Sequence, residues 1–251
     1  MDDRVQFAID GLIIPCETGR NELERSMLKH NNAPTSHQLS RMLEMQDLMN
    51  TRVDGNWVSA QHPYLRAVVI EAAEAIEHHG WKWWKKQQKD LAQLQMELID
   101  IWHFLLSEVL LRNKGDHQLS LNSLTASINS SETNIIIDEI SHEISAIDLI
   151  SKLELLIACS SLRRVEVGIF SSIMGDCQLS WAQLYAQYIG KNVLNFFRQD
   201  NGYKEGTYRK EWNGREDNEY LVEIINDLDA EDSEYQEKLR LALQESYDQA
   251  R

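Results

Sequence analysis

Apolar residues recur at helical spacing along most of the chain. Leu39 and Leu43 lie one turn apart, which is typical of the buried face of an amphipathic helix. Gly80 is a natural residue to end a helix, and Asp90 is a natural residue to begin one. The pattern in the first half of the chain predicts helices over three ranges: 36–52, opened by Ser36; 64–79, ended by Gly80; and 90–113, with Asp90 as N-cap.

The second half of the chain alternates between polar and helical patterns. Ser, Asn and Gly are frequent in 115–132, which predicts a loop or an insertion between two halves. Ser180 is a candidate N-cap for a long helix that ends before the turn dipeptide Asn201-Gly202. Helical periodicity is also expected over three further ranges: 133–160, 162–173 and, as two acidic amphipathic segments, 218–251.

Few residues interrupt these predicted helices. The chain has only three prolines, the last of them Pro63, and little alternation of β-branched residues, so long helices are favoured over strands. We therefore expect an all-α fold in a single domain over 1–251, with an insertion or mobile helical segment around 115–173.

Composition limits the class of protein. Hydrophobic residues make up 43% and charged residues 26%, close to ordinary globular usage, and no apolar run approaches the roughly 20 residues of a membrane span. The start of the chain, 1–11, is acidic where a signal peptide is basic, so we expect a cytoplasmic protein with no membrane partner. Cys16, Cys159 and Cys177 form no metal-ligand pattern and are expected to be reduced thiols.

The formal net charge of −15 argues against binding to nucleic-acid polymers, because that affinity depends on neutralising many phosphates with Lys and Arg. An acidic protein can still bind a small anion in two ways. A local patch of cations can contact the anion, or carboxylates can hold divalent metals that contact it.

Paired carboxylates occur on two successive predicted helices. Glu71 and Glu74 lie three residues apart, as do Glu97 and Asp100, so each pair shares a helix face. Antiparallel packing of the two helices would bring all four together, and such a cluster needs cations to neutralise it. Hard oxygen ligands suit Mg²⁺ or Mn²⁺. A solvated acidic face is the alternative that spacing alone leaves open.

A second polar stripe lies on the long helix predicted after Ser180. Lys191, Asn195 and Arg198 share one face, with apolar residues on the other sides. The segment beyond is rich in glycine, aromatic residues and lysine: Tyr203, Lys204, Gly206, Tyr208, Lys210, Trp212 and Gly214. Glycine lets the backbone approach an anion, lysine neutralises phosphate and aromatic rings stack on bases. The region predicts a nucleotide site, again with a solvated face as the alternative.

Three histidines lie near the carboxylates. His78 and His79 fall at the end of their predicted helix, where they favour its dipole. Neighbouring helix positions point about 100° apart, which disfavours a zinc site shared by these two. His103 is expected to pack or to support the residues beside it.

Taken together, these segments resemble the dimeric dUTPase family, within the all-α nucleoside triphosphate pyrophosphatases. The carboxylates in EAAE and ELID resemble the superfamily's Mg²⁺ ligands. Four segments resemble stretches particular to the dUTPases: GWKWW, DIWHF, GKNVLNFFRQDNGYKEGTYRKEW and GREDN. The resemblance covers about 39–218 and implies a helical bundle of the pyrophosphatase type that is active as a homodimer.

The resemblance also implies roles for individual residues. Mg²⁺ would be held by Glu71, Glu74, Glu97 and Asp100, and the attacking water would be oriented by Glu74 or, as second choice, Glu71. Contacts with uracil and deoxyribose are implied for Gln46, Asn50 and Trp57. Contacts with the phosphates and sugar are implied for Lys191, Asn195, Arg198, Asn201, Tyr203, Lys204 and Lys210.

The activity implied by the resemblance is hydrolysis of dUTP to dUMP and pyrophosphate, and of dUDP to dUMP and phosphate. It would limit uracil in DNA and supply dUMP for dTMP synthesis. Two other functions stay open. A related pyrophosphatase would act on dCTP or on several triphosphates and would need different groups at Gln46, Asn50 and Trp57. A catalytically silent helical dimerisation protein would have no use for the lysine-rich segment 202–212.

Overall fold

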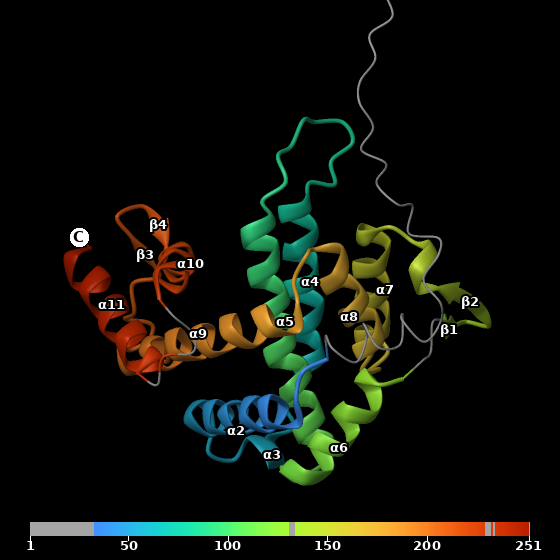
Figure 1. The fold of residues 1–251 in the computed structure, drawn as a ribbon, viewed down its shortest axis with the longest axis horizontal. Coiled ribbons are helices and arrows are strands. Elements are labelled where there is room, and N and C mark those ends of the chain that lie inside the picture. The colour runs from blue at the N-terminus through green and yellow to red at the C-terminus, as the bar shows by residue number, and fades with distance from the viewer. Residues whose placement is uncertain (1–32, 131–133, 229–231, 233, 251) are drawn as a thin grey trace, which may run out of the picture. The chain divides into compact units, whose positions relative to one another are not determined.

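Two antiparallel helices, α4 (Tyr64–His79) and α5 (Leu91–Arg112), lie at the centre of the fold. Figure 1 shows the computed structural model, which describes residues 33–130, 134–228, 232 and 234–250. Gly80 ends α4 with a positive φ of 83°, and the side chain of Asp90 accepts a hydrogen bond from the Gln93 backbone at the start of α5. The end and start signals read from the sequence are therefore confirmed.

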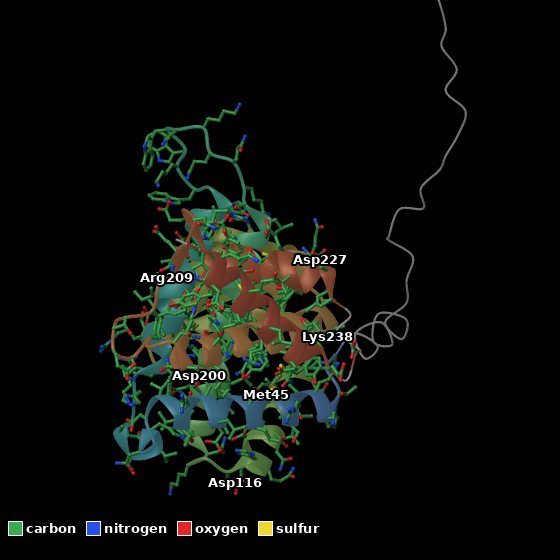
Figure 2. The ribbon with its side chains drawn as sticks, turned by 90° about the vertical axis from the view of Figure 1, so that its left-hand side faces the viewer. Met45, Asp116, Asp200, Arg209, Asp227 and Lys238 are labelled. Atoms are coloured by element: carbon green, nitrogen blue, oxygen red, sulfur yellow. The ribbon has the colours of Figure 1, made fainter. Side chains whose placement is uncertain are left out.

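Further helices cover this central pair. They are α2 (Ser36–Val53), the short α3 (Trp57–Ala60), α7 (Leu149–Ser161), α8 (Val167–Asp176) and α9 (Trp181–Asp200). Helix α7 packs against α4 and α8 against α7, whereas α9 contacts both α2 and α5. In Figure 2, α9 with its labelled last residue, Asp200, lies above α2, which carries the labelled Met45.

Buried aromatic rings join helix α5 of the central pair to the covering helices α8 and α9. Trp102 of α5 stacks on Phe170 of α8 with ring centroids 5.3 Å apart. Trp181, at the start of α9, meets Trp102 edge-on at 5.2 Å. Aromatic side chains bury a large apolar area, so this cluster helps to fix α8 and α9 against the central pair.

The structure corrects the prediction of a loop over 115–132. This stretch contains α6 (His117–Ile128), which begins where the side chain of Asp116 accepts a hydrogen bond from the Leu119 backbone at 2.8 Å. Leu124 is buried in the core. A good N-cap and one buried leucine outweigh the weak helix propensity of the Ser and Asn residues around them.

The prediction of a helix over 133–160 is wrong in its first part. Strands β1 (Asn134–Ile137) and β2 (Ile140–Glu143) pair antiparallel, with Ile137 opposite Ile140. Consecutive isoleucines favour a strand because β-branching stiffens the side chain. The two turn residues between the strands both have positive φ, as a two-residue hairpin requires. A 3₁₀ turn (Ile144–Ala146) leads into α7.

The capping residue of one helix and the start of another differ from prediction, although α2 begins at Ser36 as predicted. Thr35, and not Ser36, caps α2: its side chain accepts from the Gln38 backbone while the Gln38 side chain accepts from the Thr35 backbone. Helix α8 begins at Val167 instead of 162, because the chain turns after α7 at Arg163, where φ is +63°. Ser180 caps α9 as predicted.

The C-terminal part of the chain packs on α9. It comprises strands β3 (Glu211–Trp212) and β4 (Arg215–Glu216) and helices α10 (Asp217–Asp227) and α11 (Tyr235–Gln249). The prediction of two helices in this tail is confirmed. Gly190 allows α10 to approach α9, since a Cβ at this position would lie 2.5 Å from Ile225 Cδ1.

The described residues form helices joined by two short hairpins, which confirms the all-α prediction. In this part of the chain no helix has both the length and the apolar character needed to cross a membrane. Cys159 and Cys177 are buried free thiols. Residues 1–32, with Cys16 among them, lie outside the described residues, so a single domain over 1–251 stays a prediction.

Candidate functional site

A cavity of about 380 Å³ lies where α2, α4, α5 and α9 meet. Each helix contributes polar side chains to its wall: Gln46 and Asn50 from α2, Glu71 from α4, Asp100 and His103 from α5, and Asn195 and Arg198 from α9. Aromatic rings add to the wall: Tyr64, Phe104 and Tyr203. One cavity thus contains residues from all three predicted groups, which are the metal ligands, the contacts with the base and the contacts with the phosphates.

Three of the four predicted metal ligands form a cluster. Carboxylate oxygens of Glu71, Glu97 and Asp100 all lie within 4.8 Å of one another, because α4 and α5 pack antiparallel. Glu74 is exposed and is not part of this group. Three of the four carboxylates predicted to come together therefore do so, whereas Glu74 lies on the solvent-exposed side of the cluster.

Two carboxylates of the cluster, Glu71 and Glu97, bind protons more tightly than ordinary carboxylates do. Burial, with the charges of Asp100 and Glu74, raises the pKa of Glu71 to about 7. Burial and the charge of Asp100 raise the pKa of Glu97 to about 8. His78 Nε2 lies 3.4 Å from Glu97 Oε1, so this histidine faces the cluster as well as ending α4. A cation bound beside such carboxylates would favour their ionised form.

A buried lysine faces the acidic cluster. Lys191 Nζ lies 2.7 Å from Asp100 Oδ2 and donates to Asn218 Oδ1 at 2.8 Å. The lysine side chain is only 2% exposed, so the ion pair is shielded from water and depends on good geometry. Lys191 therefore ties α9 and α10 to α5 beside the carboxylates, behind the residues that line the cavity.

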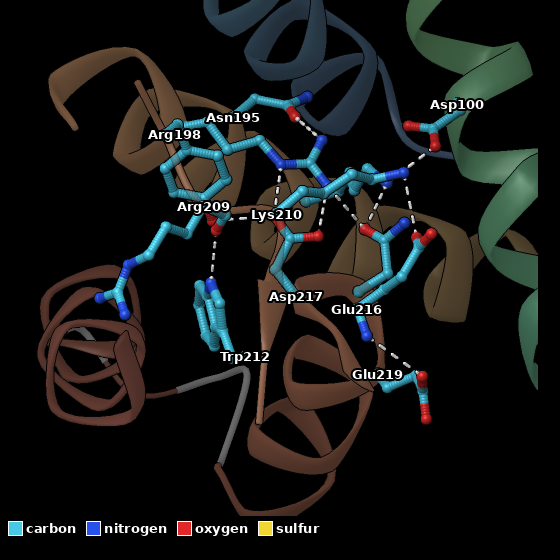
Figure 3. Close-up of polar contacts among 12 residues, drawn as sticks. Asp100, Asn195, Arg198, Arg209, Lys210, Trp212, Glu216, Asp217 and Glu219 are labelled. Carbon is cyan, nitrogen blue, oxygen red and sulfur yellow. Dashed lines mark hydrogen bonds and ion pairs between the residues drawn. The ribbon is translucent and has the colours of Figure 1, made fainter. Parts of the chain in front are cut away.

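Arg198 is held by a bidentate ion pair (Figure 3). Its Nε and Nη2 donate to the two oxygens of Asp217 at 2.8 and 2.7 Å. Nη1 donates to Asn195 at 3.2 Å, and Nη2 donates also to Asn218 at 3.1 Å. Burial alone would raise the pKa of Asp217, but the hydrogen bonds from Arg198 outweigh it and lower the pKa. The guanidinium orientation at the cavity wall is therefore set by Asp217.

Gln46 is the centre of a buried hydrogen-bond network. Its amide nitrogen donates to Ser107 Oγ at 2.8 Å and to Asn50 Oδ1 at 3.1 Å. Its amide oxygen lies 2.7 Å from His103 Nδ1 and 3.0 Å from the Tyr188 hydroxyl. Both hydrogens and both lone pairs of the amide have a partner, so in this structure Gln46 orients its neighbours.

The hydrogen bonds of Gln46 determine the tautomer of His103 and the orientation of the Asn50 side chain. Because the amide oxygen of Gln46 only accepts, His103 Nδ1 carries the hydrogen. Burial lowers the pKa of His103 to about 3, so the ring is neutral and Nε2 is an acceptor. Nε2 of His103 and Nδ2 of Asn50 are buried without a partner among the described residues. One unpaired acceptor and one unpaired donor therefore belong to two residues that line the cavity.

Of the two aromatic residues predicted to contact the substrate, one lines the cavity and the other does not. Tyr203 lines the cavity, and its ring centroid lies 5.9 Å from Arg198 Cζ. Trp57 is buried and does not line the cavity; it meets Tyr64 edge-on at 6.4 Å. Trp57 thus supports a ring of the wall from behind.

Besides Lys191, three predicted phosphate contacts lie outside the cavity wall. Asn201 ends α9, where its side chain donates to the Phe197 carbonyl at 2.9 Å. Lys204 donates to the last carbonyl of α2 at 3.0 Å. Lys210 is half exposed and pairs with Glu216 at 3.0 Å. These side chains hold the segment after α9 in place.

Sequence reasoning missed four residues that hold the cavity wall: Ser107, Tyr188, Asp217 and Asn218. It also assigned His103 only to packing or support. Ser107 follows His103 by four residues and Tyr188 precedes Lys191 by three, so helical spacing could have placed both on the site face. Asp217 and Asn218 lie in the GREDN segment, which carried the family resemblance without a residue role.

The chain is similar to a family of known proteins. A family model described as dUTPase matches residues 38–203, which is more than half of the chain. The match covers most of α2 and continues through α9, so it includes all four predicted metal ligands. No curated protein matches the chain. Asp217, the partner of Arg198, lies beyond the end of the family match.

Proposed function

Because the chain belongs to the dimeric all-α dUTPase family, we propose that it hydrolyses dUTP to dUMP and pyrophosphate with Mg²⁺, or Mn²⁺, as the metal. The same site would convert dUDP to dUMP and phosphate. The activity would limit uracil in DNA and supply dUMP for dTMP synthesis. The observation that carries the proposal is one cavity bordered by the carboxylate cluster, by Arg198 and by the pair of His103 and Asn50.

The carboxylate cluster fits a divalent metal. Glu71, Glu97 and Asp100 supply hard oxygen ligands within 4.8 Å of one another. Burial and the neighbouring carboxylates raise the pKa values of Glu71 and Glu97, and a bound divalent cation would offset this repulsion. Glu74 is proposed as a fourth ligand because it follows Glu71 by one helical turn and its charge contributes to the raised pKa of Glu71. Bound Mg²⁺ would neutralise phosphate charge and lower the pKa of a coordinated water.

Side chains of α9 are proposed to hold the phosphates. Arg198 reaches the cavity wall with its orientation fixed by Asp217, and Asn195 lies beside it. Negative charge grows on phosphate oxygens during the reaction, and a fixed guanidinium stabilises it without reorganising. Lys191 adds positive charge from behind Asp100. Tyr203 would contact the sugar, and Asn201, Lys204 and Lys210 would contact phosphate after exchanging their present partners.

A carboxylate is proposed to orient the attacking water. Glu74 is the preferred residue because it is exposed and can move toward a water beside the cluster. Glu71 is the second choice, since it lines the cavity. Either group could accept the proton as the water attacks phosphorus.

Uracil fits the acceptor and donor at the cavity wall. Its N3–H can donate to His103 Nε2 while an adjacent carbonyl accepts from Asn50 Nδ2. Cytosine in the same pose turns a lone pair at N3 toward the lone pair of His103, which leaves both groups unpaired. Gln46 would act by keeping His103 and Asn50 oriented, and Trp57 by supporting Tyr64.

Two further parts of the proposal rest on the family resemblance and on the sequence, and not on the site. The active unit is proposed to be a homodimer, which sedimentation equilibrium of the purified full chain would measure as twice the 29.1 kDa chain mass. The compartment is proposed to be the cytoplasm, which fractionation of the source cells would test.

Pyrophosphate release from dUTP, dCTP, dTTP and UTP, each with Mg²⁺ and with EDTA, tests the proposed activity. We expect Mg²⁺-dependent release from dUTP at least 100-fold above that from dCTP, in line with a polar site left unpaired by the wrong base. Release mainly from dCTP would support the related pyrophosphatase. No release from any nucleotide would leave the silent dimerisation protein.

A further inference from the structure

Helix α11 lies outside the range matched by the family and contacts the site through a series of aromatic and polar residues. We propose that Tyr247 of α11 is a positioning residue for Arg198. Tyr247 acts through Tyr208 and then Asp217. The inference rests on the proposed function in one respect, which is that Arg198 binds the phosphates of the substrate.

The last contact in the series is the carboxylate of Asp217. Its Oδ2 accepts from Arg198 Nε and from the Tyr208 hydroxyl, each at 2.8 Å, while its Oδ1 accepts from Arg198 Nη2. Burial and the charge of Asp217 raise the pKa of Tyr208, so the phenol keeps its proton and donates. The carboxylate is fully buried and is therefore held from two sides, by the arginine that it orients and by Tyr208.

The ring of Tyr208 is held in turn by Tyr247. The two rings stack with centroids 5.4 Å apart and an angle of 5° between their planes. Tyr247 also meets Phe197 edge-on at 5.5 Å, and Phe197 directly precedes Arg198 on α9. Tyr247 thus contacts one ring that carries a hydrogen-bond donor to Asp217 and another on the helix that carries Arg198.

Arg209 fixes the turn of α11 that carries Tyr247. Its Nη2 donates to the Tyr247 carbonyl at 2.9 Å and its Nη1 donates to the Ala250 carbonyl at 2.7 Å. Its guanidinium carbon lies 4.4 Å from the Tyr247 ring centroid. These carbonyls belong to the last turn and just beyond it, where helix carbonyls lack intrahelical partners and cations are favourable.

Two neighbouring residues after α9 thus connect α11 with Asp217. The Tyr208 hydroxyl donates to Asp217 while its ring stacks on Tyr247 of α11. Arg209 contacts the end of α11, and in Figure 3 its side chain points away from Asp217. Loss of the Tyr247 ring would remove the stacked partner of Tyr208, which would then be held only by its more distant contacts with Phe197 and Tyr203, and its hydrogen bond to Asp217 would be weakened. Arg198 would then occupy its bidentate orientation for a smaller fraction of time, which weakens binding of phosphate in particular.

The test compares Tyr247→Leu with Tyr235→Leu, in the full chain. Tyr235 is a buried ring on the same helix, whereas Tyr247 is half-buried, so the loss of Tyr235 controls for general loosening of α11. We expect Tyr247→Leu to raise the KM for dUTP and the Kd for inorganic pyrophosphate about tenfold, with Kd for deoxyuridine unchanged and kcat altered less. Tyr235→Leu should leave all of these near wild type. Circular dichroism and urea titration verify that each variant is folded.

Two conservative variants separate positioning from packing. Tyr208→Phe keeps the stacked ring but removes the hydroxyl, so it should reproduce the weaker phosphate binding. Tyr247→Phe keeps the ring, so this variant should have the same KM for dUTP as the wild-type chain. Equal KM values for Tyr247→Leu and Tyr235→Leu, or a wild-type KM for Tyr208→Phe, would overturn the inference.

The outcomes distinguish this inference from the proposed activity. If the wild-type chain hydrolyses dUTP and Tyr247→Leu matches its control, only the role of Tyr247 is lost. If the wild-type chain does not hydrolyse dUTP but binds pyrophosphate more tightly than Tyr247→Leu does, only the proposed activity is lost. Binding of neither dUTP nor pyrophosphate by the wild-type chain would overturn both.

Discussion

The metal-free protein should lose stability as the pH rises from about 5 to about 8. Glu97 has a pKa of about 8 in the folded chain against an ordinary value of 4.5, so it is protonated in both states only well below pH 4.5. Between pH 4.5 and 8 the unfolded chain releases this proton while the folded chain keeps it. Unfolding is then favoured increasingly with pH until the folded chain also ionises near pH 8.

The size of this effect follows from the pKa difference. A difference of about 3.5 units corresponds to an upper value of about 5 kcal/mol in the free energy of unfolding. Glu71, with a pKa of about 7, interacts with the same charges, so its contribution is not added separately. A divalent metal that binds the ionised cluster in the folded chain alone should reverse the loss.

Urea unfolding at pH 5, 6, 7 and 8, in EDTA and in saturating Mg²⁺, measures the effect. Glu97→Gln should flatten the pH dependence in EDTA and reduce the gain from Mg²⁺. Glu154→Gln, which removes an exposed carboxylate on α7, should behave as wild type. A stability in EDTA that is constant from pH 5 to 8, or that falls as steeply in Glu97→Gln, would refute the reasoning.

Three other substitutions test separate parts of the site and fold. Glu74→Gln should lower kcat for dUTP at least 100-fold without changing the urea midpoint; turnover near wild type would remove Glu74 from the chemistry. His103→Phe, which keeps a ring but no acceptor, should reduce the ratio of kcat/KM for dUTP over dCTP at least tenfold; an unchanged ratio would contradict the base-reading role. Gly190→Ala should cost about 1–3 kcal/mol of stability, and Ile225→Val should recover part of it because Cδ1 lies 2.5 Å from the new Cβ; an unaltered urea midpoint would disprove the clash.

The helices around the cluster could be predicted because their signals are local. Asp90 and Ser180 cap α5 and α9, and Gly80 ends α4, each by contacts within four residues. The prediction that α4 and α5 bring carboxylates together needed only helical spacing and antiparallel packing. The hairpin over 134–143 could not be predicted in this way, because a two-residue turn in which Asp138 and Glu139 adopt positive φ has little signal in its own residues.

The polar networks around the cavity depend on contacts that sequence spacing does not contain. Gln46 was expected to read a base, but its amide is fully used by residues from α2, α5 and α9. Arg198 was expected on the phosphate face, yet the group that orients it, Asp217, comes from the start of α10. Such partners are brought together by tertiary packing, so helical periodicity cannot identify them.

A crystal structure of the full chain with a non-hydrolysable α,β-imido analogue of dUTP and Mn²⁺ tests the proposed site most directly. We expect an anomalous Mn²⁺ peak coordinated by Glu71, Glu97 and Asp100, with uracil N3 within hydrogen-bond distance of His103 Nε2. Phosphate oxygens should contact Arg198. A metal bound away from the three carboxylates, or a base bound outside the cavity, would contradict the proposal.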